Sequence, residues 1–114
     1  MSESTLELRL WRWQRRSALL LLPLVAFHVY FQYFVVGIDG VDFSSTAARL
    51  GGGLLLVIDV LLLVTALAHG FLGLRSIAID YARSSGMARG VTVGLSVVLA
   101  AGILYGLATI FALR

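Results

Sequence analysis

The sequence contains no cysteine, no lysine and only one proline. Without cysteine the chain by itself can form no disulfide, no thiolate metal site and no iron–sulfur cluster site, so any iron–sulfur chemistry must belong to a partner. Charge is scarce as well, because 13% of residues are charged against about 25% in an average soluble domain. All nine basic residues are arginine and lie beside apolar runs instead of along a groove. This distribution argues against nucleic acid binding.

Apolar residues make up 60% of the chain, and they gather in three segments, at 17–37, 52–79 and 91–113. Each segment has about 20 residues or more, which is enough for a helix to cross a hydrocarbon core of roughly 30 Å. The first segment is too long for a signal peptide, and no small-residue cleavage pattern follows it. We therefore predict an all-α membrane protein with three transmembrane helices in a single domain, 1–114.

The arginines predict the orientation of these helices. Seven of the nine flank the start of the first helix or the turn between the second and third: Arg9, Arg12, Arg15, Arg16, Arg75, Arg83 and Arg89. Only Arg49 and Arg114 fall on the other side. Cytoplasmic loops carry the excess of arginine, so we expect a cytoplasmic N-terminus and a C-terminus outside.

His69 lies inside the second helix, roughly 16 Å along the axis from Asp80, and therefore close to the membrane midplane. An ionisable side chain at this depth indicates a functional site. At 100° per residue, Asp80 falls within about 20° of the His69 direction and Gly73 about 40° away. A neutral imidazole beside a slot cleared by glycine suits axial ligation of haem iron. Alternatively, His69 only bonds a neighbouring helix and Gly73 only allows close helix packing.

The spacing of His69, Gly73, Asp80 and Tyr81, with eleven residues from histidine to acid and tyrosine directly after it, resembles the small hydrophobic membrane-anchor subunit of succinate dehydrogenase, respiratory complex II. The segment WRWQRRSA at 11–18 is similar to the start of that family's first helix. The three-helix layout extends the resemblance over most of the chain.

The resemblance implies that His69 is one axial ligand of a b-type haem, with the opposite ligand supplied by the second anchor subunit, a cytochrome b. It implies that Tyr81 hydrogen-bonds a carbonyl oxygen of bound quinone, ubiquinone or menaquinone, near the cytoplasmic face. Asp80 would shape this quinone site or deliver protons to it. The other implied partners are an iron–sulfur subunit and a flavoprotein subunit, and the implied location is the prokaryotic cytoplasmic (inner) membrane. Without the resemblance, Tyr81 would be interpreted as an interfacial anchor.

Three further side chains are candidates. His28 follows Ser17 by eleven residues, which places it near the expected depth of His69. It would ligate a second haem, replace the partner's ligand, or only bond a neighbouring helix. Arg75 would pair with haem propionates or extend to the interface, and for Asp59 we favour an interfacial or intersubunit ion pair over a proton relay.

Our interpretation is the membrane anchor subunit of a succinate:quinone oxidoreductase, outside the catalytic head of the enzyme, which passes electrons from succinate oxidation to membrane quinone. One alternative is a b-type cytochrome subunit of another dehydrogenase or of a fumarate reductase. A second is a cofactor-free structural or assembly protein in which His69 and Asp80 only pack helices.

Overall fold

The computed structural model describes residues 3–51 and 53–113, and all of its regular elements in this part are helices. In chain order they are α1 (Glu3–Tyr30), a π-helical segment η1 (Phe31–Gly37), a 3₁₀ turn η2 (Ile38–Gly40), α2 (Phe43–Arg49), α3 (Gly53–Asp80) and α4 (Ser85–Leu113). Three stretches are long and apolar enough to cross a membrane: Thr5–Gly40, Gly53–Asp80 and Ser85–Leu113. The predicted all-α architecture with three spans is confirmed.

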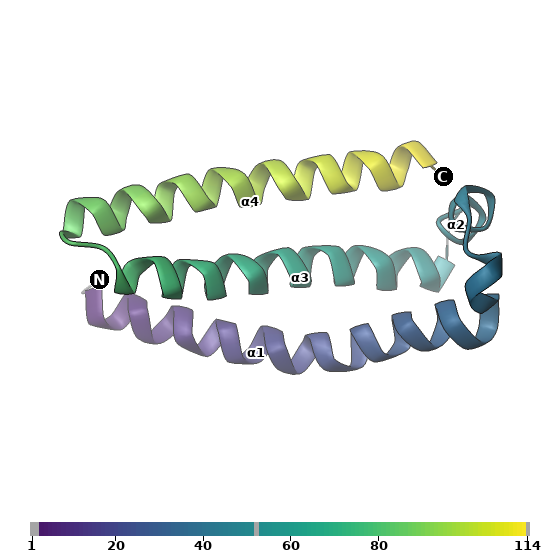
Figure 1. Ribbon diagram of the computed structural model, residues 1–114, viewed down its shortest axis with the longest axis horizontal. Helices are drawn as coiled ribbons and strands as arrows, with labels where there is room; N and C mark the ends of the chain where they lie inside the picture. Colours follow the sequence, from purple (N-terminus) through teal and green to yellow (C-terminus); the bar gives the residue numbers. More distant parts are fainter. Residues whose placement is uncertain (1–2, 52, 114) are drawn as a thin grey trace.

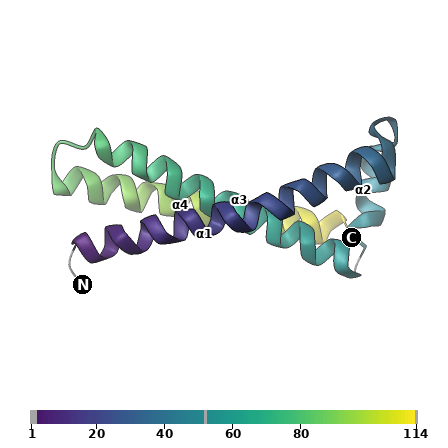
Figure 2. The ribbon, with the colours of Figure 1, turned by 90° about the horizontal axis from the view of Figure 1, so that it is seen from below.

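The helix α3 lies between α1 and α4 (Figure 1). The beginning of α1 and the turn from α3 to α4 lie at one end of the bundle, and α2 and the end of α4 lie at the other (Figure 1). Seen from below, α1 crosses the other two helices at a clear angle (Figure 2). The molecule is 50 Å long, so it extends past both edges of a hydrocarbon core of roughly 30 Å.

The ends of the helices differ from the prediction at two places. The first helix begins at Glu3 instead of residue 17, and α4 begins at Ser85 instead of residue 91. Both additions are too polar to count as membrane span, but they are rich in Leu, Arg, Gln, Glu, Ala and Met, which favour the helix. The second helix agrees within one residue at its C-terminal end, while its predicted first residue, 52, lies outside the described residues, as does residue 114.

The face of α1 that meets α3 follows a heptad pattern. Its less exposed residues recur at alternating steps of four and three: Leu10, Gln14, Ser17, Leu21, Leu24 and His28, continued by Phe31 in η1. This spacing is that of a coiled-coil seam. Three seam residues are polar, and polar contacts hold membrane helices together because lipid solvates apolar side chains as well as a neighbouring helix does.

The contact between α3 and α4 is instead apolar and close. A Cβ added at Gly106 would lie 2.7 Å from Leu63 Cδ2, and one added at Gly102 would lie 3.6 Å from Leu67 Cδ1. The two glycines therefore act as holes for leucine side chains of α3. Small residues at such positions let helix backbones approach in a membrane.

The connection between the first two spans was expected as a polar loop, and the structure adds the short helix α2 within it. The Asp42 carboxylate caps this helix by accepting a 2.7 Å bond from the Ser45 amide, and this bond lowers the pKa of the Asp42 carboxyl. Leu50, directly after α2, is the most buried apolar residue described, with 4% of its surface exposed. Its burial packs the connection against the end of the bundle.

Candidate functional site

The imidazole of His69 faces α1 and is partly buried. Its Nδ1 lies 2.9 Å from the Oγ of Ser17, and that hydroxyl donates a 2.8 Å bond to the backbone oxygen of Gln14. A hydroxyl has one hydrogen, so with that hydrogen on Gln14 the Ser17 oxygen accepts from Nδ1–H. The bonding therefore assigns the neutral tautomer with a lone pair on Nε2, which is the form that can bind a metal.

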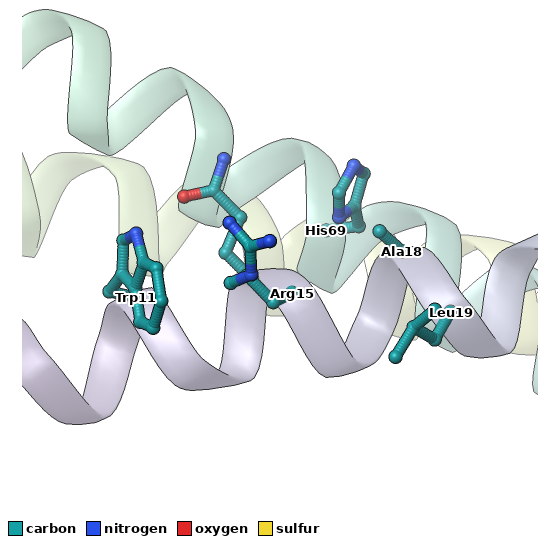
Figure 3. A pocket seen from close by; sticks show the side chains of 6 residues that line it. Trp11, Arg15, Ala18, Leu19 and His69 are labelled. Carbon is teal, nitrogen blue, oxygen red and sulfur yellow. The ribbon is translucent and has the colours of Figure 1, made fainter.

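An open hollow of about 410 Å³ adjoins this ring, lined by Trp11, Gln14, Arg15, Ala18, Leu19 and His69. Along α1, Arg15 lies between Trp11 and His69 (Figure 3). The Arg15 guanidinium carbon lies 4.8 Å above the indole ring of Trp11, an arrangement that fixes a positive charge at the wall of the hollow. The hollow thus combines an imidazole, a cation and apolar walls.

The glycines beside His69 have different surroundings. A Cβ added at Gly73 would lie 3.6 Å from Gln14 Nε2, an ordinary contact, while one at Gly70 would meet nothing within 4 Å. The space beside Gly73 is thus shared with the Gln14 amide, which itself lines the His69 hollow. Gly73 remains a predicted haem contact.

Arg75 is bound to other side chains of this chain. Only 6% of the residue is exposed, and its guanidinium donates two bonds to the Glu7 carboxylate, of 2.8 and 3.1 Å, and one of 2.9 Å to Thr92 Oγ1. These bonds join α1, α3 and α4. The propionate-binding role predicted for Arg75 stays a prediction, and any such role has to share the guanidinium with Glu7.

The expected equal depth of His28 and His69 is wrong. His28 Nδ1 lies 3.7 Å from Asp59 Oδ1, and Asp59 precedes His69 by ten residues, or roughly 15 Å of helix. Ser17, eleven residues before His28, lies at the level of His69 instead. A ligand role for His28 therefore remains a prediction for a second haem and not for the iron at His69.

Asp59 forms an ion pair within the chain, with its Oδ2 3.0 Å from Nε of Arg49. Both side chains are 13% exposed. The favoured prediction of an ion pair for Asp59 is confirmed, although its partner is the end of α2 and not another subunit. The pair ties the connection between the first two spans to α3.

Asp80 is the last residue of α3 and Tyr81 follows it, and both are exposed, Tyr81 to 80%. Tyr81 comes twelve residues after His69, roughly 18 Å along the helix. The structure therefore brings His69 together with Ser17 and Gln14, but it keeps Asp80 and Tyr81 apart from them at the end of the bundle. In the part of the chain that is described, their side chains form no hydrogen bond or ion pair.

The sequence analysis missed Glu7, Thr92 and the contact by which Ser17 orients the His69 ring. A signal for two of them was present, because Glu7 and Ser17 fall on the heptad that runs through Gln14 and His28. Thr92 gave no such signal. Among the described residues no group of three or more His, Asp or Glu side chains could enclose a metal ion, whereas a haem needs only an axial donor from the chain.

The fold and these polar contacts define a multi-pass helical membrane protein with an imidazole held inside the bundle. The model of one family, the succinate dehydrogenase/fumarate reductase transmembrane subunit, matches residues 1–109. The chain belongs to this family, and membership implies that it assembles with other subunits of such a complex. Membrane subunits of this family are associated in general with haem and quinone. A search among individual curated proteins found no match.

Proposed function

We propose that the chain is the small membrane anchor of a succinate:quinone oxidoreductase, in which His69 binds the iron of a b-type haem through Nε2. The observation that carries this proposal is the Ser17–His69 contact of 2.9 Å. Metal-bound histidines almost always donate their other ring N–H to an acceptor, which fixes the tautomer and makes the ligand more basic. Ser17 provides that acceptor.

The residues around the ring fit a haem in three respects. The hollow of about 410 Å³ opens beside the imidazole, its walls include the apolar Ala18 and Leu19, and the Arg15 cation suits an anionic propionate. The hollow is open on one face, where the second anchor subunit, a cytochrome b, would supply the other axial ligand. When bound, the haem stores one electron at a time.

Tyr81 and Asp80 form the proposed quinone site at the cytoplasmic end of α3. A phenol joins an apolar ring to a hydrogen-bond donor, which suits a quinone that has an apolar body and carbonyl acceptors. Asp80 borders the same end of the helix about 100° round from Tyr81 and can hold or pass a proton. Quinone reduction takes up two protons, and both exposed side chains lie where water and the iron–sulfur subunit can reach them.

The experiment that tests the function is purification of the complex through this chain. We expect a flavoprotein and an iron–sulfur subunit to copurify, with succinate-dependent quinone reduction and a reducible b-type Soret band. A Soret band with a head that does not oxidise succinate would select the cytochrome of another dehydrogenase. A preparation without haem and without a head would select the cofactor-free structural protein.

A further inference from the structure

The Glu7–Arg75 ion pair is the most extensive polar contact between α1 and α3. Two nearly parallel bonds, of 2.8 and 3.1 Å, join one guanidinium to one carboxylate, which is the geometry that gives arginine pairs their directional specificity. The Arg75 side chain is 7% exposed and the Glu7 side chain 51%. A third bond to Thr92 holds the guanidinium from the side of α4.

We propose that Glu7 and Arg75 are positioning residues that set the register of α1 on α3 and so hold Ser17 against His69. The pair lies outside the His69 hollow, and the haem part of its role rests on the proposed function. The register itself does not.

The geometry of two packed helices explains why this pair can select a register. Sliding α1 by one residue moves Glu7 by about 1.5 Å along the axis and turns it by about 100°. Paired N–H···O bonds tolerate only about 2.7–3.2 Å, so the slipped arrangement loses both. The leucines of the same seam accept neighbouring holes, and polar residues on such seams specify register at a cost in stability.

The pair is also continuous with the site. Glu7 and Arg75 border a hollow of about 210 Å³ that Trp11 and Gln14 line as well, and these last two residues also line the His69 hollow. Glu7 precedes Gln14 by seven residues, one heptad, on the same face of α1. A shift of Glu7 on Arg75 therefore moves Gln14 and Ser17 relative to His69.

The register can be measured without any cofactor because the chain has no cysteine. Cysteines placed by Gln14→Cys and Gly73→Cys stand at facing positions, since a Cβ at Gly73 lies 3.6 Å from the Gln14 amide. We expect a short bis-maleimide to cross-link them within the chain in whole membranes. Glu7→Gln should reduce the yield several-fold, and Arg75→Lys should reduce it less, because lysine keeps the charge but loses the fork. Asp39→Asn, at an exposed acid far from the seam, is the matched control.

The link to the site is tested by the midpoint potential of the haem in the assembled complex. Ser17→Ala removes the acceptor of Nδ1–H and should raise the potential, because the imidazole becomes less basic. Glu7→Gln should shift it in the same direction, and the double variant should shift it no further than Ser17→Ala alone.

Unchanged cross-linking in Glu7→Gln would overturn the register, and additive shifts of the potential would overturn the link to Ser17. A complex without haem would refute the proposed function instead, while the cross-linking would still decide the register.

Discussion

At the scale of single residues, His69 and Tyr81 differ in how much of their chemistry this chain determines. The tautomer of His69 is fixed inside the chain, because Ser17 and Gln14 form the bonds that leave Nε2 free. Tyr81 is 80% exposed, and any partner for its hydroxyl comes from quinone or another subunit. The two residues therefore call for different tests.

For Tyr81 we predict that Tyr81→Phe lowers quinone reduction several-fold. The variant keeps the ring and loses one hydroxyl, and a lost hydrogen bond costs about 0.5–1.5 kcal/mol, more if a buried acceptor is left unpaired. Succinate oxidation by a water-soluble dye that takes electrons from the head should remain nearly intact. Tyr105→Phe, at a tyrosine of α4 that is 78% exposed, is the matched control. Equal loss of both activities would indicate defective assembly, and no loss would make Tyr81 an interfacial anchor.

The sequence predicted the depth of His69 but not its partner. Depth follows from counting residues along an apolar run, whereas a partner depends on the register of two helices that are far apart in the chain. The same limit explains the error at His28, where counting from Ser17 assumed that the first helix enters the membrane at that residue. Because α1 begins at Glu3, Ser17 itself lies at the level of His69.

At the scale of elements, the three long helices use two kinds of contact. The seam between α1 and α3 carries polar pairs at three levels: Glu7 with Arg75, Ser17 with His69 and His28 with Asp59. The contact between α3 and α4 depends on glycine holes filled by leucine. Hydropathy predicts that such helices cross the membrane, but it contains no signal for which helix lies in the middle.

The glycine contact predicts a difference between two substitutions on α4. Gly106→Ala places a methyl group 2.7 Å from Leu63, whereas Gly94→Ala meets nothing within 4 Å. Both changes gain similar helix propensity, so only Gly106→Ala should lower the thermal midpoint of the purified complex, by overpacking that costs about 1–3 kcal/mol. Equal midpoints for the two variants would show that the α3–α4 contact is not close at Gly106.

At the scale of the whole molecule, the bundle has one end rich in arginine. The beginning of α1 and the turn before α4 lie at this end (Figure 1), and Arg83 and Arg89 flank that turn. Arg49 lies at the other end, in a pair with Asp59. The distribution supports the predicted orientation with the arginine-rich end in the cytoplasm.

The orientation predicts the outcome of two reporter fusions. A reporter placed near Gly86 should be active only if it works in the cytoplasm, and one placed after Arg114 only if it works outside. The opposite pattern would place Tyr81 and Asp80 on the outer face and would exclude them from a quinone site beside the head.

The most direct test of haem ligation by His69 is the visible spectrum of the complex with His69→Ala. We predict that the haem is lost or becomes high-spin, because the iron retains at most the partner's ligand. His28→Ala is the matched control, and it should keep the low-spin signal of the haem at His69, since His28 contacts Asp59 roughly 15 Å away along the bundle. An unchanged low-spin b-type spectrum in His69→Ala would contradict ligation by His69 and would make His28 the leading candidate for the ligand.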